Sequence, residues 1–194
     1  MFSLFNVATT VDGGRINIAT CSVGGGQFCL DYAVRVVTNN CFVAHSEALF
    51  QMDYVQQRKQ FGRQLGEFQH TQFKLADMQT QLHASRLMVR HAARALDAKA
   101  PTATADAAMA KRFATDACYD ITNDALQLLG GYGYLRDYPV ERCDGFAPLN
   151  QGVLDQHDAN PRYMRDLRVH SILEGTNEVM RMIVHREMLK QRSA

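Results

Sequence analysis

The sequence contains no long apolar segment and no excess of either charge. Among its 194 residues, no apolar run approaches the roughly 20 that a helix needs to cross a bilayer. Lys and Arg total 21, Asp and Glu total 20, and the formal net charge is +1. A charge so nearly balanced gives no sign of the basic surfaces that bind nucleic acids or anionic membranes. We therefore expect neither a nucleic acid nor a membrane as a partner.

Cysteines are few, and their spacing matches no common framework. There are five, and no two of them have CxxC spacing. An odd number without that spacing argues against a disulfide framework or a zinc site and favours a reducing compartment. The apolar N-terminal segment has no basic residue before Arg15. It lacks the positive start of a secretory signal and the arginines of a transit peptide, so we expect no targeting segment in this chain.

The motifs of several enzyme classes are missing as well. The seven histidines show neither HExxH nor another metal-ligand spacing, so we expect no metal site. No serine has the GxSxG setting of a hydrolase nucleophile, and no GxGxxG fingerprint follows a strand pattern. Apolar and polar residues do not alternate in any clear run, so nothing in the sequence predicts a sheet.

Two long segments without helix breakers occupy the middle of the chain. Residues 71–99 contain no Gly or Pro, and 104–129 end at Gly130 and Gly131, a usual helix stop. The few residues around Pro101 that separate them favour antiparallel neighbours. Apolar residues recur at helical intervals in both segments: Leu75, Met78, Leu82, Val89, Ala93 and Leu96 in the first, and Met109, Phe113, Ala117 and Ile121 in the second.

Helices are also expected near both ends of the chain. One starts after Asp12-Gly13-Gly14 and is weakened by the glycines of 24–26, which cost about 1 kcal/mol each relative to Ala. The last begins near Thr176, whose hydroxyl can cap it, with an apolar stripe of Val179, Met182, Ile183 and Leu189. A chain of this length forms one domain. The sequence predicts an all-α fold, an up-and-down bundle of about four or five long helices.

Residues 35–52 and 143–162 do not fit this helical pattern. The first stretch shows no sustained periodicity, and the second contains two of the four prolines, two glycines and three aspartates. We expect both stretches to be poorly ordered or to bulge away from the bundle.

Two clusters contain side chains suited to holding a ligand. Arg58 to Gly62, followed by Gln69, offers a guanidinium that fits phosphate oxygens and an aromatic ring that can pack on a flat ligand. The same residues are typical of a solvated basic pair at a helix end. The run from Gln127 to Tyr134 contains glycines that let a ligand approach the backbone, although a helix cap followed by a turn has the same composition.

A third cluster surrounds one carboxylate. Glu174 lies between apolar residues and Gly175, just before the expected last helix. Apolar surroundings raise the pKa of a carboxyl group, whereas a nearby helix N-terminus lowers it. A glutamate held between these influences can act as a general base. An acidic residue that stabilises the first turn of a helix is the simpler interpretation.

Together, in this order, the clusters resemble one family. The segments DGGRINIA, RKQFGRQLGEFQ, QLLGGYGYLRDYPVER and YMRDLRVHSILEGTNEVMRMIV are similar to the C-terminal helical domain of acyl-CoA dehydrogenases. The similarity covers nearly all of the chain except 35–52 and 143–162, which resemble inserted sequence. It implies FAD as cofactor, a homotetramer built around this domain, and a mitochondrial matrix location, or the cytoplasm in a bacterium. These segments are most similar to those of the family members that act on short- and branched-chain substrates.

The resemblance implies roles for individual residues. Glu174 matches the catalytic base, Gly175 a glycine that contacts the substrate, and Asp12 and Arg15 match residues that contact the acyl-CoA. One branch of the family carries its base just before that arginine, where this chain has Gly14, so Glu174 has no rival. The matches to FAD contacts are Arg58, Gln69, Gln127, Leu128, Leu129, Gly130, Gly131, Thr176, Asn177 and Glu178; in the family, those from 58 to 131 reach the FAD of a neighbouring subunit.

The implied reaction is the α,β-dehydrogenation of an acyl-CoA, followed by electron transfer to an electron-transferring flavoprotein. Family members also carry an N-terminal helical domain and a middle β-domain, which we expect to be absent from this chain. We therefore expect the isolated chain to be inactive. Two alternatives remain: a non-catalytic helical oligomerisation module derived from the family, and a flavin-dependent acyl-CoA oxidase.

Overall fold

Five α-helices make up most of the described part of the protein. A computed structural model describes residues 4–38, 59–134 and 163–192. The helices are α1 (Leu4–Thr38), α3 (Gln69–Asp97), α4 (Ala103–Leu129), α5 (Tyr163–His170) and α6 (Asn177–Arg192). Two short 3-10 helices, η1 (Leu65–Glu67) and η2 (Gly130–Tyr134), precede α3 and follow α4. The predicted all-α, up-and-down bundle is confirmed.

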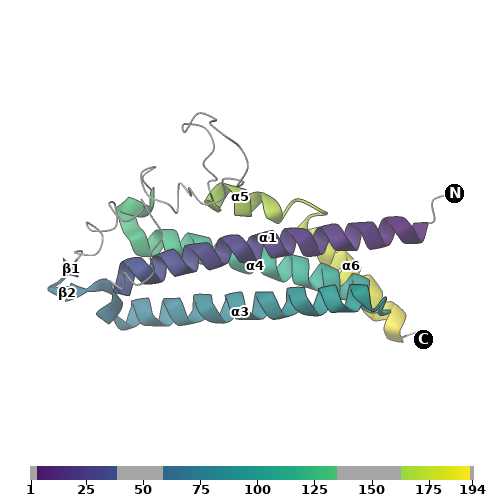
Figure 1. The fold of residues 1–194 in the computed structure, drawn as a ribbon, viewed down its shortest axis with the longest axis horizontal. Helices are drawn as coiled ribbons and strands as arrows, with labels where there is room; N and C mark the ends of the chain where they lie inside the picture. The colour runs from purple at the N-terminus through teal and green to yellow at the C-terminus, as the bar shows by residue number, and fades with distance from the viewer. Residues whose placement is uncertain (1–3, 39–58, 135–162, 193–194) are drawn as a thin grey trace, which may run out of the picture.

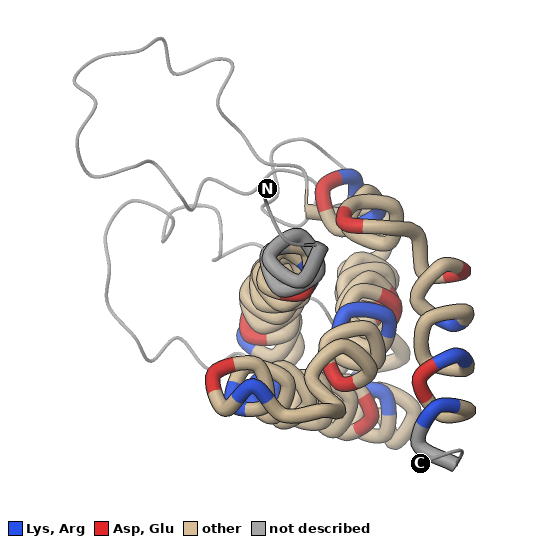
Figure 2. The backbone as a smooth tube through the Cα atoms, turned by 90° about the vertical axis from the view of Figure 1, so that its right-hand side faces the viewer, with Lys and Arg blue, Asp and Glu red and all other residues tan. Residues whose placement is uncertain are grey.

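The three long helices α1, α3 and α4 run side by side along the long axis, and each reverses the direction of the one before (Figure 1). Viewed along that axis, they form a three-cornered bundle with α5 and α6 beside it (Figure 2). α5 packs against α1 and α4, and α6 packs against α4. Helix α4 therefore contacts all four of the other described helices. None of the described helices is long and apolar enough to cross a membrane.

The predicted apolar face of α3 does point into the bundle. Met78, Leu82 and Val89 are buried, and the other three predicted residues pack partly buried against the same two core clusters. In the first cluster, Met78 and Leu82 meet Leu30 of α1 and Ile121 of α4. The helical spacing of the sequence therefore identified the correct face of α3.

Helix α4 is buried mainly through small side chains. Of the four residues predicted for its core face, Ala117 and Ile121 are buried and Met109 and Phe113 are only half-buried. Small residues on one helix allow neighbouring backbones to approach closely, which suits a helix that is enclosed by all the others. The alanines buried on α4 are Ala103, Ala105, Ala107, Ala108, Ala110, Ala114, Ala117 and Ala125.

The predicted start of the first helix is wrong. α1 begins at Leu4 and runs without a break through Asp12-Gly13-Gly14 and the glycines of 24–26. Two of these glycines lie where other helices come close: a Cβ on Gly25 would lie 3.2 Å from Leu167 of α5, and one on Gly26 would lie 3.1 Å from Cys118 of α4. Packing against α4 and α5 therefore outweighs the low helix propensity of glycine.

The two stretches that depart from the helical pattern are only partly described. Residues 35–38 form the last turn of α1, where Val36 and Val37 are buried. Residues 39–52 and 143–162 lie outside the described residues, and so does Arg58.

A small antiparallel hairpin, β1 (Lys59–Gln60) and β2 (Arg63–Gln64), was not predicted. Its two turn residues, Phe61 and Gly62, have φ values of 54° and 79°, as a type I′ hairpin turn requires. Strands of two residues are too short to produce an alternating pattern in the sequence.

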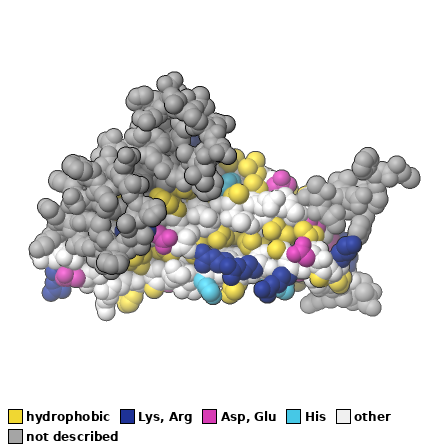
Figure 3. All heavy atoms as spheres, viewed as in Figure 1, with side chains coloured by type: hydrophobic (Ala, Val, Ile, Leu, Met, Phe, Trp, Pro, Cys, Tyr) yellow, Lys and Arg dark blue, Asp and Glu magenta, His cyan; other side chains and the backbone are white. Residues whose placement is uncertain are grey.

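Helix α6 starts where the sequence predicted but buries a different face. The Val179 amide donates to the Thr176 hydroxyl at 3.4 Å, which supports the predicted cap. Of the predicted stripe, Ile183 is buried, whereas Met182 is 70% exposed and Val179 and Leu189 are also exposed. Met180 takes their place in the core beside Ala108 of α4. Apolar side chains thus remain on the surface of the described helices (Figure 3).

The glycines of α1 allow a direct test of this packing. A Cβ on Gly24 would meet no described atom within 4 Å, whereas one on Gly26 would lie 3.1 Å from the Cβ and Sγ of Cys118. We expect Gly24→Ala to raise the free energy of unfolding by about 0.5–1 kcal/mol and Gly26→Ala to lower it by about 1–3 kcal/mol. Urea unfolding followed by circular dichroism measures both changes. Equal stabilisation by the two substitutions would contradict the packing described here.

Candidate active site

The predicted base lies on a turn with an unusual backbone. Glu174 and Gly175 connect α5 to α6, with φ values of 56° and 92°. The left-handed region costs a residue with a side chain about 1–2 kcal/mol, and such conformations cluster at functional sites. The backbone N–H of Asn177 donates to the Ser171 carbonyl at 3.0 Å and closes the turn. The apolar enclosure expected for Glu174 is not found among the described residues, because Glu174, Ile172 and Leu173 are exposed.

The carboxylate of Glu174 rests against α1 at Gly14. A Cβ on Gly14 would lie 2.5 Å from Glu174 Oε2, 2.6 Å from Cδ and 2.8 Å from Oε1. The absence of a side chain at this position is what allows the carboxylate to lie there. The fold thus brings Glu174 beside the Asp12–Arg15 segment, which lies about 160 residues earlier in the sequence.

The two residues predicted to contact acyl-CoA are bonded to each other. Arg15 Nη1 donates to Asp12 Oδ1 at 2.6 Å, and Thr104 Oγ1 of α4 donates to Asp12 Oδ2 at 2.7 Å. Asp12 is buried, and both of its oxygens are occupied by these bonds. Arg15 Nε is buried and has no hydrogen-bond partner among the described residues. In this geometry Asp12 orients Arg15, which keeps donors for another group.

A buried lysine that the sequence analysis missed supports the Glu174 turn. Lys111 of α4 is fully buried, and its Nζ donates to the Gly175 carbonyl and to Asn177 Oδ1, both at 2.8 Å. Burial lowers the pKa of this ammonium to about 8, although the carboxylates of Asp116 and Glu178 oppose the shift. Its one sequence signal is a charged residue on the alanine face of α4.

Asn177 ties the start of α6 to α4. Its Nδ2 donates to Thr115 Oγ1 at 2.9 Å and to Asp116 Oδ1 at 2.6 Å, while its Oδ1 accepts from Lys111. The side chain is buried, so its polar atoms serve the protein rather than solvent. Although Asn177 was predicted to contact FAD, its amide is already engaged by α4.

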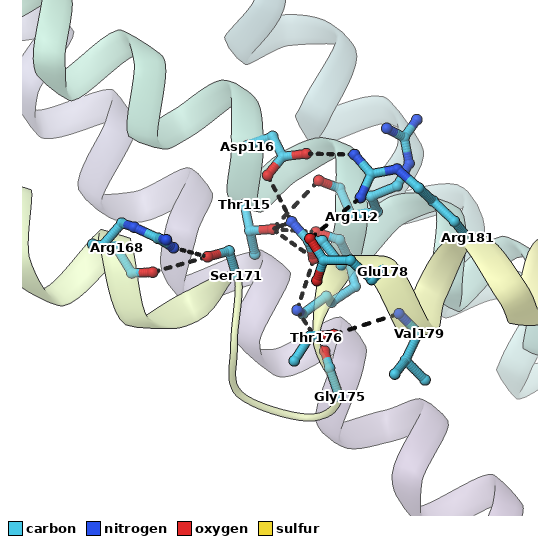
Figure 4. A network of polar contacts seen from close by, with 12 residues as sticks. Arg112, Thr115, Asp116, Arg168, Ser171, Gly175, Thr176, Glu178, Val179 and Arg181 are labelled. Carbon is cyan, nitrogen blue, oxygen red and sulfur yellow. Dashed lines mark hydrogen bonds and ion pairs between the residues drawn. The ribbon is translucent and has the colours of Figure 1, made fainter.

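A polar hollow of about 380 Å³ opens beside these contacts, between α4, α5 and α6 (Figure 4). Thr176 and Glu178, two of the predicted FAD residues, lie on its wall together with Arg168 and Arg181. The pKa of Glu178 is lowered by a backbone amide and by the Thr176 hydroxyl. The hollow is lined by Thr115, Asp116, Tyr119, Arg168, Ser171, Ile172, Thr176, Asn177, Glu178 and Arg181.

The predicted FAD residues of α3, α4 and η2 lie at one end of the bundle, where α3 begins and α4 ends (Figure 1). Gln69 is the first residue of α3, and Gln127 is exposed near the end of α4. Leu128 and Leu129 turn inward and pack in the core. The predicted residues therefore form two separate groups.

The three glycines that follow α4 are explained by different features of the structure. Gly130 ends the helix with a φ of 61°. A Cβ on Gly133 would lie 2.5 Å from the Leu126 carbonyl, so packing alone accounts for that glycine. Gly131 is exposed and has no described atom within 4 Å of a Cβ. Packing among the described residues does not explain Gly131, and the space beside it is open to a ligand.

No group of three or more His, Cys, Asp or Glu side chains that could hold a metal ion occurs among the described residues. The polar atoms of the site are instead amide, hydroxyl, ammonium and guanidinium donors together with carboxylates. Such a set suits hydrogen bonding to an organic ligand and proton transfer.

The contact between Gly14 and Glu174 can be measured without any activity. Gly13 and Gly14 are neighbours inside α1, and a Cβ on Gly13 would meet no described atom within 4 Å. We expect Gly13→Ala to stabilise the chain by about 0.5–1 kcal/mol. Gly14→Ala should stabilise the chain less than Gly13→Ala, by a difference on the order of 1 kcal/mol, because the methyl group displaces the Glu174 side chain.

Repeating both substitutions in a Glu174→Ala background supplies the control for this prediction. Without the carboxylate, the two alanines should stabilise the chain equally, as a double-mutant cycle of urea unfolding would detect. A difference between them that persists without the carboxylate would show that Glu174 does not lie against Gly14.

Comparison with known proteins identifies the family. Residues 34–189 match the family model described as acyl-CoA dehydrogenase, C-terminal domain. The mitochondrial isobutyryl-CoA dehydrogenase of Dictyostelium discoideum is 48% identical over 187 residues, which cover 96% of this chain and 36% of that protein. The mitochondrial isobutyryl-CoA dehydrogenase of Bos taurus is 43% identical over 181 residues, covering 93% of this chain and 34% of its own length.

The fold is shared with a solved structure of the same family. Butyryl-CoA dehydrogenase from Megasphaera elsdenii superposes with a TM-score of 0.72 at 36% sequence identity, over 96% of this chain and 39% of that chain. The present chain thus spans little more than a third of the length of these relatives. Both the sequence and the fold show that the chain belongs to the acyl-CoA dehydrogenase family and corresponds to its C-terminal helical domain.

Proposed function

We propose that this chain supplies the catalytic base of an FAD-dependent acyl-CoA dehydrogenase that acts on a short- or branched-chain acyl-CoA, and that Glu174 is that base. The observation that carries the proposal is the position of the Glu174 carboxylate, against Gly14 and beside the Asp12–Arg15 pair. The resemblance of the motifs to the family implies that both segments contact the substrate. Isobutyryl-CoA is the substrate we favour, because two relatives of this chain are named isobutyryl-CoA dehydrogenases.

The role of Glu174 is to remove the proton α to the thioester carbonyl. An exposed carboxylate on a turn can reach a ligand that lies over α1, and a partner domain that covers this surface would exclude water from it. Glu174 has a positive φ, a conformation that costs a residue with a side chain free energy and is found at functional sites. Arg15 would stabilise the Glu174 carboxylate before the step. After the step, the protonated Glu174 could remain beside Arg15.

Arg15 provides a direct contact to the substrate, whereas Asp12 acts through Arg15. The Asp12 carboxylate is buried and accepts from Arg15 Nη1 and Thr104 Oγ1, so it serves to hold Arg15 in place. Arg15 keeps an unpartnered, buried Nε–H. A buried donor without an acceptor costs about 1–3 kcal/mol, and a bound carbonyl or phosphate oxygen would remove that cost.

The residues present fit FAD in two places. The hollow beside α6 combines hydroxyl groups with the cations Arg168 and Arg181 and the carboxylates Asp116 and Glu178. This mixture of donors and acceptors suits the hydroxyl and amide groups of FAD better than its pyrophosphate. Thr176 and Glu178 would hold the cofactor there. When bound, FAD accepts the β-hydrogen as hydride, while this chain supplies the base and the binding contacts.

A second set of FAD contacts would come from the end of the bundle where α3 begins and α4 ends. Gln69, Gln127 and Gly131 are exposed there, and Gly131 leaves room for a close approach. Because this end is separate from the Glu174 turn, one molecule of FAD cannot easily meet both sets within one chain. Contacts to the FAD of a neighbouring subunit would explain the separation and would require a homo-oligomer, which we propose to be a tetramer as in the family.

We further propose that electrons leave through an electron-transferring flavoprotein and that the protein acts in the mitochondrial matrix. The mitochondrial origin of the isobutyryl-CoA dehydrogenases from Dictyostelium discoideum and Bos taurus supports this location.

The assignment of the base predicts the effect of one isosteric change. In an assembly of this chain with the N-terminal and β domains of the family, Glu174→Gln keeps the side-chain shape but cannot accept a proton. We expect the anaerobic reduction of the flavin by isobutyryl-CoA to slow by at least about 10²-fold. Stopped-flow flavin absorbance measures this step directly.

Glu187→Gln is the matched control for that experiment. Glu187 lies on α6, where it accepts from Lys190 and Arg186, and its loss should leave flavin reduction unchanged. Reduction at the wild-type rate in Glu174→Gln would rule out Glu174 as the base.

We expect the chain by itself neither to hold FAD tightly nor to oxidise acyl-CoA. Its FAD contacts lie in two separate places, and nothing among the described residues encloses a flavin ring. Catalysis of this kind depends on position, and a displacement of about 1 Å can cost roughly 10²-fold. Purified chain should lose added FAD on gel filtration and show no turnover with an artificial electron acceptor or with oxygen.

If the chain does turn over acyl-CoA, the electron acceptor that it needs would separate a dehydrogenase from an oxidase. Turnover that is lost in Glu174→Gln would show that the helical domain suffices. Oxygen consumption without need of an acceptor would indicate an oxidase instead.

A further inference from the structure

We propose that Lys111 is the positioning residue for Glu174: its buried ammonium fixes the turn that carries the carboxylate by bonding the Gly175 carbonyl and Asn177. The importance of this contact for catalysis rests on the proposed function of Glu174, but the contact itself does not. Lys111 does not touch the substrate-facing carboxylate, and the family match assigns it no role.

A fully buried lysine requires a specific reason. Lysine is among the residues least often buried, because its ammonium loses hydration. Both acceptors of Lys111 Nζ, the Gly175 carbonyl and Asn177 Oδ1, are neutral amide oxygens at 2.8 Å. An apolar side chain of similar volume often serves a core equally well or better than a buried charge. The bonds that only an ammonium can make here all go to the Glu174 turn.

One backbone hydrogen bond closes the turn, from the Asn177 N–H to the Ser171 carbonyl, and contacts from outside hold its middle. Glu174 and Gly175 both have positive φ, so neither belongs to the hydrogen-bond ladder of α5 or α6. The Gly175 carbonyl points toward α4, where Lys111 donates to it. A hydrogen bond from a charged donor is roughly twice as strong as one between neutral groups. Loss of this bond would free the Gly175–Thr176 peptide, one residue beyond Glu174.

Asn177 provides the second attachment of the turn. Three residues from one side of α4, Lys111, Thr115 and Asp116, bond to its side chain. The turn is therefore held at Gly175 and again two residues later. Glu174 precedes the first attachment by one residue, so its Cα follows the position of α4.

Charged groups from every neighbouring element act on Lys111. Asp116 of α4, Glu178 of α6 and Glu174 itself favour its charged form, and Arg15 of α1 opposes it. Lys111 in turn disfavours the protonated form of His170 of α5. The base, the arginine beside it and the buried lysine thus belong to one electrostatic group, which the turn assembles.

The test uses the chain itself and needs no activity. Lys111→Met keeps a long flexible side chain but removes both bonds, and Lys74→Met, which removes a surface lysine paired with Asp124, is the matched control. Amide hydrogen exchange of residues 172–177 should accelerate at least about tenfold in Lys111→Met. Amides in the cores of α3 and α4 should change no more than in the control. Equal acceleration throughout the bundle would overturn the proposal and leave Lys111 a general stability residue.

A measurement on the wild type covers the case in which Lys111→Met does not fold. With carbonyl-¹³C glycine and labelled lysine, the Gly175 carbonyl and the Lys111 side chain should titrate with one midpoint, near the lysine pKa of about 8. A Gly175 carbonyl that does not change as the Lys111 side chain titrates would refute the contact.

Activity then tests the catalytic consequence separately. In the assembly with the other family domains, Lys111→Met should lower kcat at least about tenfold with little change in KM, whereas Lys111→Arg should restore part of the rate. Normal flavin reduction in Glu174→Gln would disprove the proposed base while leaving the exchange result standing. Rapid exchange of the turn with unchanged kcat would overturn the positioning role.

Discussion

The close packing of α4 against every other described helix is the constraint on which the structure depends. Its buried face consists largely of alanine, so α1, α3, α5 and α6 can approach its backbone from several directions. The glycines of α1 complement this face, because Gly26 meets Cys118 of α4 where a methyl group would not fit. The charged residues Arg112, Asp116, Asp120 and Asp124 of α4 are not buried, whereas Lys111 lies on the buried face, and this makes it exceptional. Its ammonium can be satisfied only by groups that other elements bring to it.

Those groups belong to the turn that carries the proposed base. Burial lowers the pKa of Lys111 from 10.5 to about 8, and each pKa unit corresponds to about 1.4 kcal/mol, so the fold disfavours the charged form by a few kcal/mol. The strained backbone at Glu174 costs free energy as well. Both costs fall on the same few residues, and core packing elsewhere must offset them. Concentration of unfavourable terms at one place is typical of a functional site.

Much of the fold could be predicted from the sequence because it depends on local pattern. The spacing from Leu75 to Leu96 identified the face of α3 that is buried, and Gly130 marked the end of α4. The start of α1 was predicted wrongly, since glycine propensity indicated a weak helix whereas α4 and α5 stabilise it. On α6, the predicted stripe was mostly wrong because the helix touches its neighbour on a narrow strip, where Met180 and Ile183 are buried and Val184 is partly buried.

By itself, the sequence determined the all-α class, the face of α3 that is buried and the family of the chain, because helical periodicity and short motifs are properties of neighbouring residues. Tertiary structure alone decided which distant residues form the candidate site. It placed Glu174 against Gly14, turned Asp12 into a support for Arg15, and engaged Asn177 in bonds to α4. It also revealed Lys111, whose two hydrogen-bond acceptors lie more than 60 residues away in the sequence. Periodicity cannot encode such a contact, since it arises only when three helices and a turn meet.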